Sequence, residues 1–158
     1  DKDHRTAMMD AAARGHVQVV KLLVDGGAEL EAKDKEGATA LLLAAGEGQT
    51  DVVATLLAKG ANPNAHDKLG GTALIWAIGS HRTDVVELLL AAGADPNQQD
   101  VDGVSALIEA VNTGHGDFIG PLLSYRADPS LKDARGRTAM DIARQKGNQE
   151  AIALLAKP

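Results

Sequence analysis

The stretch DKEGATALLLAAGEGQTDVVATLLAKGANPNAH, residues 34–66, contains one complete unit of the pattern that runs through this 158-residue chain. Its opening D-x-x-G is typical of a turn, because an Asp side chain accepts hydrogen bonds from the backbone that follows it and Gly tolerates positive φ. Thr39 comes next, where its hydroxyl can cap the first turn of a helix. Residues 40–45 predict a short apolar helix, and Gly48 stands where a left-handed residue ends such a helix.

A second helix is predicted over residues 51–57, because Val52, Val53, Leu56 and Leu57 form one apolar stripe at helical spacing. Neither helix is long enough to be stable alone, since isolated helices shorter than about 12–15 residues are marginal in water. Each helix pair must therefore bury its apolar face against a neighbouring pair. The expected result is a one-dimensional stack of modules.

The same pattern recurs every 33 residues. A Thr-Ala or Ser-Ala pair marks each module, beginning at Thr6, Thr39, Thr72, Ser105 and Thr138. The turn glycine precedes this pair in four modules, and His4 replaces it in the first. The predicted modules are 1–33, 34–66, 67–99, 100–132 and a shortened 133–158, which together form a single domain spanning residues 1–158.

The recurring D-x-x-G-x-T-A-L…A-A…G-H…V-V…L-L…G-A-D-P-N resembles the ankyrin repeat, and the resemblance covers the whole chain. The family motif T-P-L-H has Ala in place of Pro here, and its His is replaced by Met9, Leu42, Ile75, Ile108 and Asp141. The resemblance implies an all-α solenoid of paired antiparallel helices with β-turn or hairpin loops. It also implies a protein or peptide partner, bound in a concave groove formed by the turn tips and the exposed side of the first helices.

The two ends of the chain differ in polarity. The last module carries Asp141, Arg144 and Gln145 where earlier modules are largely apolar or small, which is typical of a polar terminal cap. The first module shows no comparable polar face, so we expect further repeats to precede it in the full protein.

Composition excludes several classes of protein. There is no cysteine, which indicates a reducing compartment such as the cytoplasm and leaves the nucleus or an organelle open. No apolar run reaches the roughly 18 residues of a membrane span, so membrane insertion is not expected. The net charge of −6 disfavours nucleic acid as a partner. We expect a monomer.

Candidate chemistry is sparse. The run from Asp100 to Gly103 resembles the start of a calcium loop, but Val111 stands where such a loop needs a bidentate Glu, so we interpret the run as a repeat turn. The five histidines contain no metal-binding i, i+4 pair. Gly46 is interpreted as an extra neighbour of Gly48 rather than as part of a phosphate loop. The sequence therefore predicts no metal, no cofactor, no small-molecule substrate and no enzyme activity.

The residues that vary between modules while the frame around them stays constant are the candidate partner-binding residues. Trp76, the only Trp, is expected to be partly exposed at their centre, because its position in other modules holds Asp10, Leu43, Glu109 or Ile142. The alternative is that Trp76 covers small residues such as Gly79 within the stack. The predicted partner-binding residues are Trp76, Leu69, Val101, Val104, Lys68, Asp102, Glu109, Asn112, Arg5, Arg14, Lys35, Glu47, Arg135 and Arg137.

Two further expectations follow. The array can instead be a structural spacer or regulatory brace in a longer protein whose flanking domains carry the activity. The family resemblance also implies that Asn97, which follows Asp95 by two residues and Leu89 by eight, is a possible site of asparagine hydroxylation.

Overall fold

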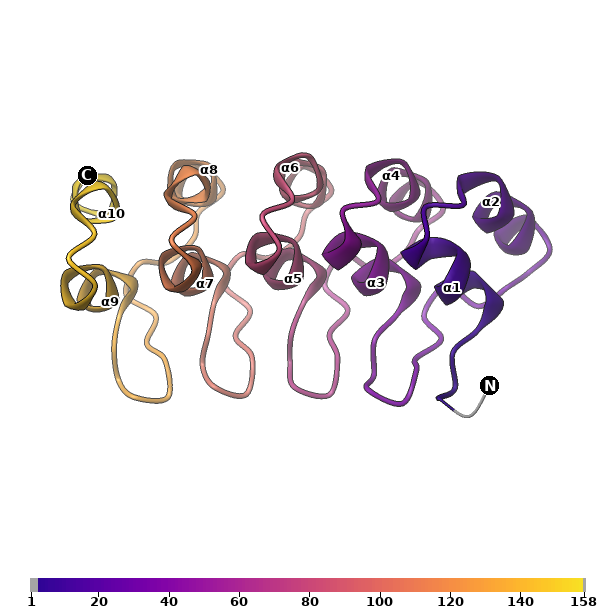
Figure 1. The fold of residues 1–158 in the computed structure, drawn as a ribbon, viewed down its shortest axis with the longest axis horizontal. Helices are drawn as coiled ribbons and strands as arrows, with labels where there is room; N and C mark the ends of the chain where they lie inside the picture. The colour runs from indigo at the N-terminus through magenta and orange to yellow at the C-terminus, as the bar shows by residue number, and fades with distance from the viewer. Residues whose placement is uncertain (1–2, 158) are drawn as a thin grey trace. The chain divides into compact units, whose positions relative to one another are not determined.

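The computed structural model describes residues 3–157 and consists of short helices joined by turns (Figure 1). The chain divides into two compact units, Asp1–Ala94 and Asp95–Pro158. The first unit contains α1 (Ala7–Ala13), α2 (Val17–Asp25), α3 (Ala40–Glu47), α4 (Thr50–Ala58), α5 (Ala73–Gly79) and α6 (Thr83–Ala91). The second unit contains α7 (Ala106–Thr113), the 3₁₀ helix η1 (Gly116–Phe118), α8 (Ile119–Ser124), α9 (Ala139–Gln145) and α10 (Gln149–Leu155). The expectation of a single domain stays a prediction.

The first helix of every module begins at the predicted cap. Thr39 is extended, and its hydroxyl accepts a hydrogen bond from the backbone N–H of Leu42 at 3.4 Å. Thr6, Thr72, Ser105 and Thr138 cap their helices in the same way. At the other end of α3, Gly48 has φ 74°, which confirms the predicted left-handed end of the helix.

The helices of each unit form layers (Figure 1). In the first unit, α1, α3 and α5 pack side by side, as do α2, α4 and α6. In the second unit, α7 packs against α9 and α8 against α10. The turns project from the first helix of each pair, on the side away from the second helix. Leu41, Val52 and Leu56 lie fully buried between the helices, so the short helices are stabilised by one another, as their length requires.

The turns are held by their aspartates. One carboxylate oxygen of Asp34 accepts hydrogen bonds from the backbone N–H groups of Glu36 at 3.0 Å and Ala38 at 2.8 Å. The same pair of bonds is made by Asp67, Asp100 and Asp133. The prediction of a repeat turn at Asp100 is therefore confirmed.

Neighbouring turns are joined by backbone hydrogen bonds. In the first unit, the N–H of Lys35 donates to the carbonyl of Asp3 at 2.8 Å, and the N–H of Lys68 donates to that of Glu36 at 2.9 Å. In the second unit, the N–H of Ala134 donates to the carbonyl of Asp102 at 2.8 Å. Within each unit, the turn tips consequently form a row whose spacing is fixed by the backbone.

Within residues 3–157, three residues other than Gly have positive φ, and each stands at a position that is Gly in other modules. They are His4 at 57°, His81 at 54° and Arg126 at 65°. His4 confirms the predicted substitution in the first turn. Arg126 replaces the glycine that follows the second helix elsewhere, at Gly27, Gly60 and Gly93.

Arg126→Gly is expected to raise the free energy of unfolding by about 1 kcal/mol, because a left-handed backbone costs an L-residue roughly 1–2 kcal/mol and part of that gain is offset by the greater chain entropy of Gly. Urea unfolding monitored by circular dichroism measures the change. The matched reverse variant is Gly60→Ala, since Gly60 has φ 93° and open space where a Cβ would lie. It should be destabilised by a similar amount, and a neutral result for both variants would contradict the backbone explanation.

The second helix of the fourth module is irregular. It opens with η1 and continues as α8, which has six residues, whereas α4 and α6 have nine each. Pro121 lies in the first turn of α8, where its missing N–H costs little, and not in a helix interior. The weakness of this helix therefore comes from its short length and from Gly116 and Gly120.

Native-state hydrogen exchange is expected to be fastest, among the second helices of the four full modules, over residues 116–125. A six-residue helix with Gly at its start has few internal hydrogen bonds, and Gly costs about 1 kcal/mol relative to Ala. Exchange followed by NMR or mass spectrometry measures this directly. Equal protection of α2, α4, α6 and α8 would be the contrary result.

Candidate functional site

The second carboxylate oxygen of the turn aspartate is bound differently in different modules. One oxygen, Oδ1, fixes the turn in each case, so the other is available to side chains of the same module. In the third module, Oδ2 of Asp67 accepts a hydrogen bond from Nε1 of Trp76 at 3.0 Å. In the fifth module, Oδ2 of Asp133 accepts from Nη2 of Arg137 at 2.6 Å and from Nε at 2.9 Å.

Trp76 is half-buried, which confirms the expectation that it is partly exposed. Its ring lies against two glycines: a Cβ on Gly46 would come within 3.0 Å of Cε3, and a Cβ on Gly71 within 2.8 Å of Nε1. The small residues that Trp76 contacts are therefore Gly46 and Gly71, whereas Gly79 is exposed. Both contacts require the absence of a side chain at the glycine.

Leu69 lies at the tip of the same turn and is 66% exposed. Its backbone N–H donates to Asp67 at 2.8 Å, so Asp67 holds both the Leu69 backbone and the Trp76 indole. Lys68 is exposed beside it. The other half of the predicted apolar patch belongs to the second unit, where Val101 is 65% exposed and Val104 is half-buried. Each half of the predicted patch is therefore described within its own unit.

The charged candidates of the first unit lie at its surface. Lys35 pairs with Asp3 at 2.8 Å, which lowers the pKa of the Asp3 carboxyl, and Arg5 pairs with Asp10 at 3.0 Å. Arg14 and Glu47 are exposed at the ends of α1 and α3. Exposed ion pairs contribute little to stability, so these charges have little effect on folding.

The second unit contains a hollow of about 260 Å³. Two consecutive turns and α7 form its walls. It is lined by Asp102, Val104, Asn112, Asp133, Ala134, Arg135 and Arg137. Five of these residues are sequence-predicted partner-binding residues, namely Asp102, Val104, Asn112, Arg135 and Arg137. The structure therefore places residues from two modules around one cavity.

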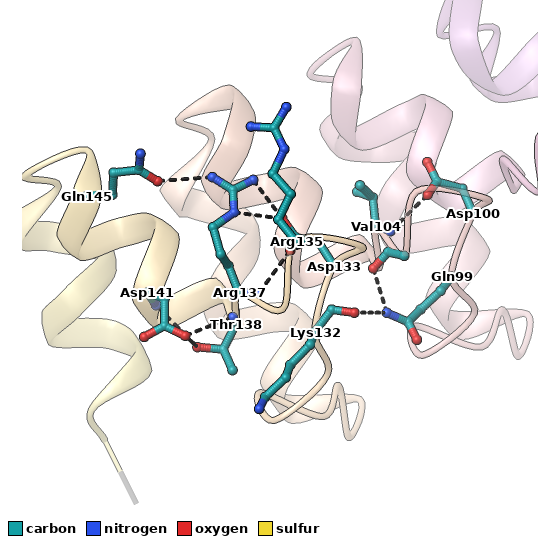
Figure 2. Close-up of polar contacts among 11 residues, drawn as sticks. Gln99, Asp100, Val104, Lys132, Asp133, Arg135, Arg137, Thr138, Asp141 and Gln145 are labelled. Carbon is teal, nitrogen blue, oxygen red and sulfur yellow. Dashed lines mark hydrogen bonds and ion pairs between the residues drawn. The ribbon is translucent and has the colours of Figure 1, made fainter.

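The two arginines of this hollow differ in their contacts, as Figure 2 shows. The guanidinium of Arg137 bridges Asp133 and the side-chain oxygen of Gln145, to which Nη1 donates at 3.0 Å. These bonds hold the pKa of the Asp133 carboxyl below its ordinary value. Arg135 is exposed, and its side chain points away from this pair. The guanidinium of Arg137 is thus engaged within its own module, whereas Arg135 is exposed.

Glu109 occupies in the fourth module the position that Trp76 has in the third. It is half-buried on α7. Burial raises the pKa of its carboxyl, the negative charge of Asp100 raises it further, and His115 lowers it. This position of the fourth module therefore adds a carboxylate whose pKa is raised both by burial and by the charge of Asp100.

Asn97 has both ends of its amide engaged. Nδ2 donates to the carbonyl of Arg126 at 3.0 Å, and Oδ1 accepts from the N–H of Asp128 at 2.7 Å. The side chain therefore links two successive loops of the second unit. Hydroxylation of Asn97 stays a prediction, and it would require these two hydrogen bonds to open.

The described residues reveal no site for metal chemistry or membrane insertion. Residues 3–157 contain no group of three or more His, Cys, Asp or Glu side chains placed to hold a metal ion. In the same part of the chain, no helix has both the length and the apolar character that crossing a bilayer requires.

Two sets of contacts in the site were not predicted from the sequence. Gly46 and Gly71 contact Trp76, and the sequence contains a signal for both contacts. Gly71 is a small residue in the same module as the bulky Trp76, and Gly46 is a small residue in the module before it. The bridge from Arg137 to Asp133 and Gln145 also had a signal, because its three members are spaced at i, i+4 and i+12. Spacing alone does not say which way a side chain points.

The family model described as "Ankyrin repeats (3 copies)" matches residues 8–100 and residues 74–158. The two matches together cover nearly the whole chain, and they confirm both the resemblance and the all-α solenoid class. No curated protein was found to match.

Proposed function

The chain belongs to the ankyrin-repeat family, and from this premise we propose that it is a non-enzymatic protein-interaction module that binds a partner protein or peptide along its turn tips and first helices. Ankyrin repeats are generally protein–protein interaction modules. We further propose that the chain acts as a monomeric scaffold or adaptor in a reducing compartment such as the cytoplasm. Nucleic acid is disfavoured by the net charge of −6.

One observation supports this proposal most strongly: the turns share one backbone conformation but differ in their exposed side chains. Every turn aspartate from Asp34 onward makes the same two hydrogen bonds, and backbone bonds join neighbouring turns within each unit. The exposed residues that follow these aspartates are nonetheless unlike one another, being Lys68 and Leu69, Val101 and Asp102, or Arg135. A rigid frame that displays different side chains is suited to recognition, because little conformational entropy is lost on binding.

The apolar residues supply the expected energetic centre in the first unit. Trp76 is held by a hydrogen bond and two glycine contacts, and Leu69 lies exposed on the same turn. Exposed apolar groups rimmed by polar residues such as Lys68 mark interaction surfaces, and Trp is enriched among binding hot spots. We propose that Lys35, Arg5, Arg14 and Glu47 form the charged periphery of this surface.

The proposal is tested by capturing partners from cell extract on the immobilised chain and identifying them by mass spectrometry. The experiment compares variants of two exposed leucines. Leu69→Ser alters a turn tip, and Leu22→Ser alters α2, where Leu22 is 73% exposed. A partner lost with Leu69→Ser and retained with Leu22→Ser supports the groove. Equal capture by both variants and the parent chain would contradict it.

The alternative function is a structural spacer or regulatory brace. In that case, Leu69→Ser should leave capture unchanged and should lower the stability of the longer protein in which the array is embedded. The two functions therefore differ in which measurement responds to the same substitution.

A further inference from the structure

The fourth module lacks the side-chain donor that the third and fifth modules supply to their turn aspartates. Oδ1 of Asp100 accepts the N–H groups of Asp102 at 2.9 Å and Val104 at 2.8 Å, as in the sister turns. Among the described residues, no side chain donates to its other oxygen. The residues in the positions of Arg137 and Trp76 are Val104 and Glu109, neither of which has a side-chain N–H.

The acceptors that hold Arg137 in the fifth module have counterparts 33 residues earlier. Asp133 corresponds to Asp100, and Gln145 corresponds to Asn112. Both Asp100 and Asn112 are only partly exposed, and Asn112 lines the hollow together with Val104. The fourth module thus keeps a carboxylate and an amide oxygen at the positions whose counterparts bind a guanidinium in the fifth module. The arginine that supplies this guanidinium is replaced by the shorter Val104.

Glu109 adds a second carboxylate at this place, since it replaces the apolar Ile142 of the fifth module. Glu109 stands at the position of Trp76, whose Nε1 donates to the turn aspartate of the third module at 3.0 Å, and the charge of Asp100 raises the pKa of the Glu109 carboxyl. A cation placed between them would relieve their repulsion. This feature distinguishes the fourth module from the second, where the equivalent residues are Asp34, Leu43 and Gly46.

We propose that Asp100, Glu109 and Asn112, at the repeat positions of Asp133, Ile142 and Gln145, form a binding site for an arginine side chain of the partner protein, held as Arg137 is held by Asp133 and Gln145. The inference rests on the proposed function and names the chemistry of its partner. Arginine fits better than lysine, because the sister site uses Nε, Nη1 and Nη2 on two separate acceptors, and only a guanidinium presents such a planar set of donors. Arg135, which is exposed and lines the hollow together with Val104 and Asn112, offers a second contact to an acidic residue of the same segment.

The test uses N-acetyl-L-arginine amide as the probe and the ¹⁵N-labelled chain as the receptor. Titration should produce saturable shifts in the backbone signals of residues 100–104 and 109 and in the side-chain amide of Asn112. N-acetyl-citrulline amide, the neutral analogue of nearly the same shape, should bind at least about tenfold more weakly, because hydrogen bonds to charged groups are the strong ones. Equal shifts with both probes, or shifts spread over all exposed acidic residues, would overturn the proposal.

Val104→Arg supplies the missing guanidinium from within the chain. It should pair with Asp100 as Arg137 pairs with Asp133, and it should weaken probe binding about tenfold or more. Val104→Leu is the matched control, since it enlarges the side chain without adding a donor, and it should bind the probe as the parent chain does. Asp100→Asn keeps an oxygen for the turn N–H groups and removes the charge, so it should also weaken binding. Undiminished probe binding by Val104→Arg and Asp100→Asn would show that the site is wrong.

The same variants separate this inference from the proposed function. A partner that is lost with Leu69→Ser but is captured equally by Val104→Arg would refute the arginine site and leave the interaction module standing. Conversely, if the probe binds as expected and no variant of the turn tips changes partner capture, the arginine site stands and the proposed function fails.

Discussion

Gly37→Ala is expected to lower the free energy of unfolding by about 3 kcal/mol, because it combines backbone strain with a steric conflict. Gly37 has φ 85°, which an L-residue adopts at a cost of roughly 1–2 kcal/mol. A Cβ at this position would lie 2.8 Å from the backbone nitrogen of Lys68 and 3.3 Å from the carbonyl carbon of Asp67. These are backbone atoms of the next turn, so they cannot move aside as a flexible side chain would. The substitution should therefore also break the hydrogen bond from Lys68 to Glu36.

Gly136→Ala is the matched control for this prediction. Gly136 occupies the same place in the last turn and has φ 76°, but a Cβ there would meet nothing within 4 Å. Only the backbone strain applies, so the expected loss is about 1 kcal/mol. Urea unfolding of the two variants measures both changes. Equal losses would show that contact between turns adds nothing to the cost, and would contradict the role assigned to the row of turn tips.

Trp76→Ala is expected to weaken binding of the captured partner by about 2 kcal/mol or more, since a hot-spot Trp typically contributes that much. Isothermal titration calorimetry with the parent chain as reference measures this effect. The substitution also removes the hydrogen bond to Asp67 and a half-buried ring, so we expect a loss of unfolding free energy of about 1 kcal/mol. A loss of several kcal/mol in stability with affinity unchanged would instead assign Trp76 to the core.

Gly46→Ala offers a control that leaves Trp76 in the sequence. Its new Cβ would lie 3.0 Å from Cε3 of the indole, so the ring must shift from its position. Gly46 has negative φ and tolerates Ala in its backbone conformation. If the position of the indole matters for recognition, affinity should fall while the helix α3 stays stable. Unchanged affinity in Gly46→Ala, together with a loss in Trp76→Ala, would show that ring area rather than ring position is recognised.

The elements of the fold were predictable from short-range chemistry. Thr39, Asp34 and Gly48 each act on backbone groups within about four residues of themselves, so the cap, the turn and the helix end follow from the local sequence. The period of 33 then extends the same structure to every module. The weakness of the second helix of the fourth module stays a prediction: the structure shows that this helix is short and irregular, with Pro121 in a tolerated first turn rather than in an interior.

The site itself was only partly predictable. The identities of the exposed candidates, such as Leu69, Arg135 and Asn112, followed from variation within a constant frame, and the structure places them on turns or on the exposed side of a first helix. Their contacts did not follow. The sequence predicts the same role for Arg137 and Arg135, whereas of these two guanidinium groups that of Arg137 is bound by side chains of its own module.

By itself, the amino-acid sequence determined the module, its period and the conformation of its backbone, because hydrogen bonds between near neighbours decide these features. Only the tertiary structure decided which side chains meet: Trp76 with Gly46 of the preceding module, Arg137 with Asp133 and Gln145, and Val104 beside an aspartate that receives no such donor. Such contacts depend on the directions of side chains and on residues about one repeat away. A pattern of residue types specifies neither the directions of side chains nor these distant neighbours. The architecture of the array therefore follows from the repeat, whereas the contacts of its side chains follow from tertiary packing.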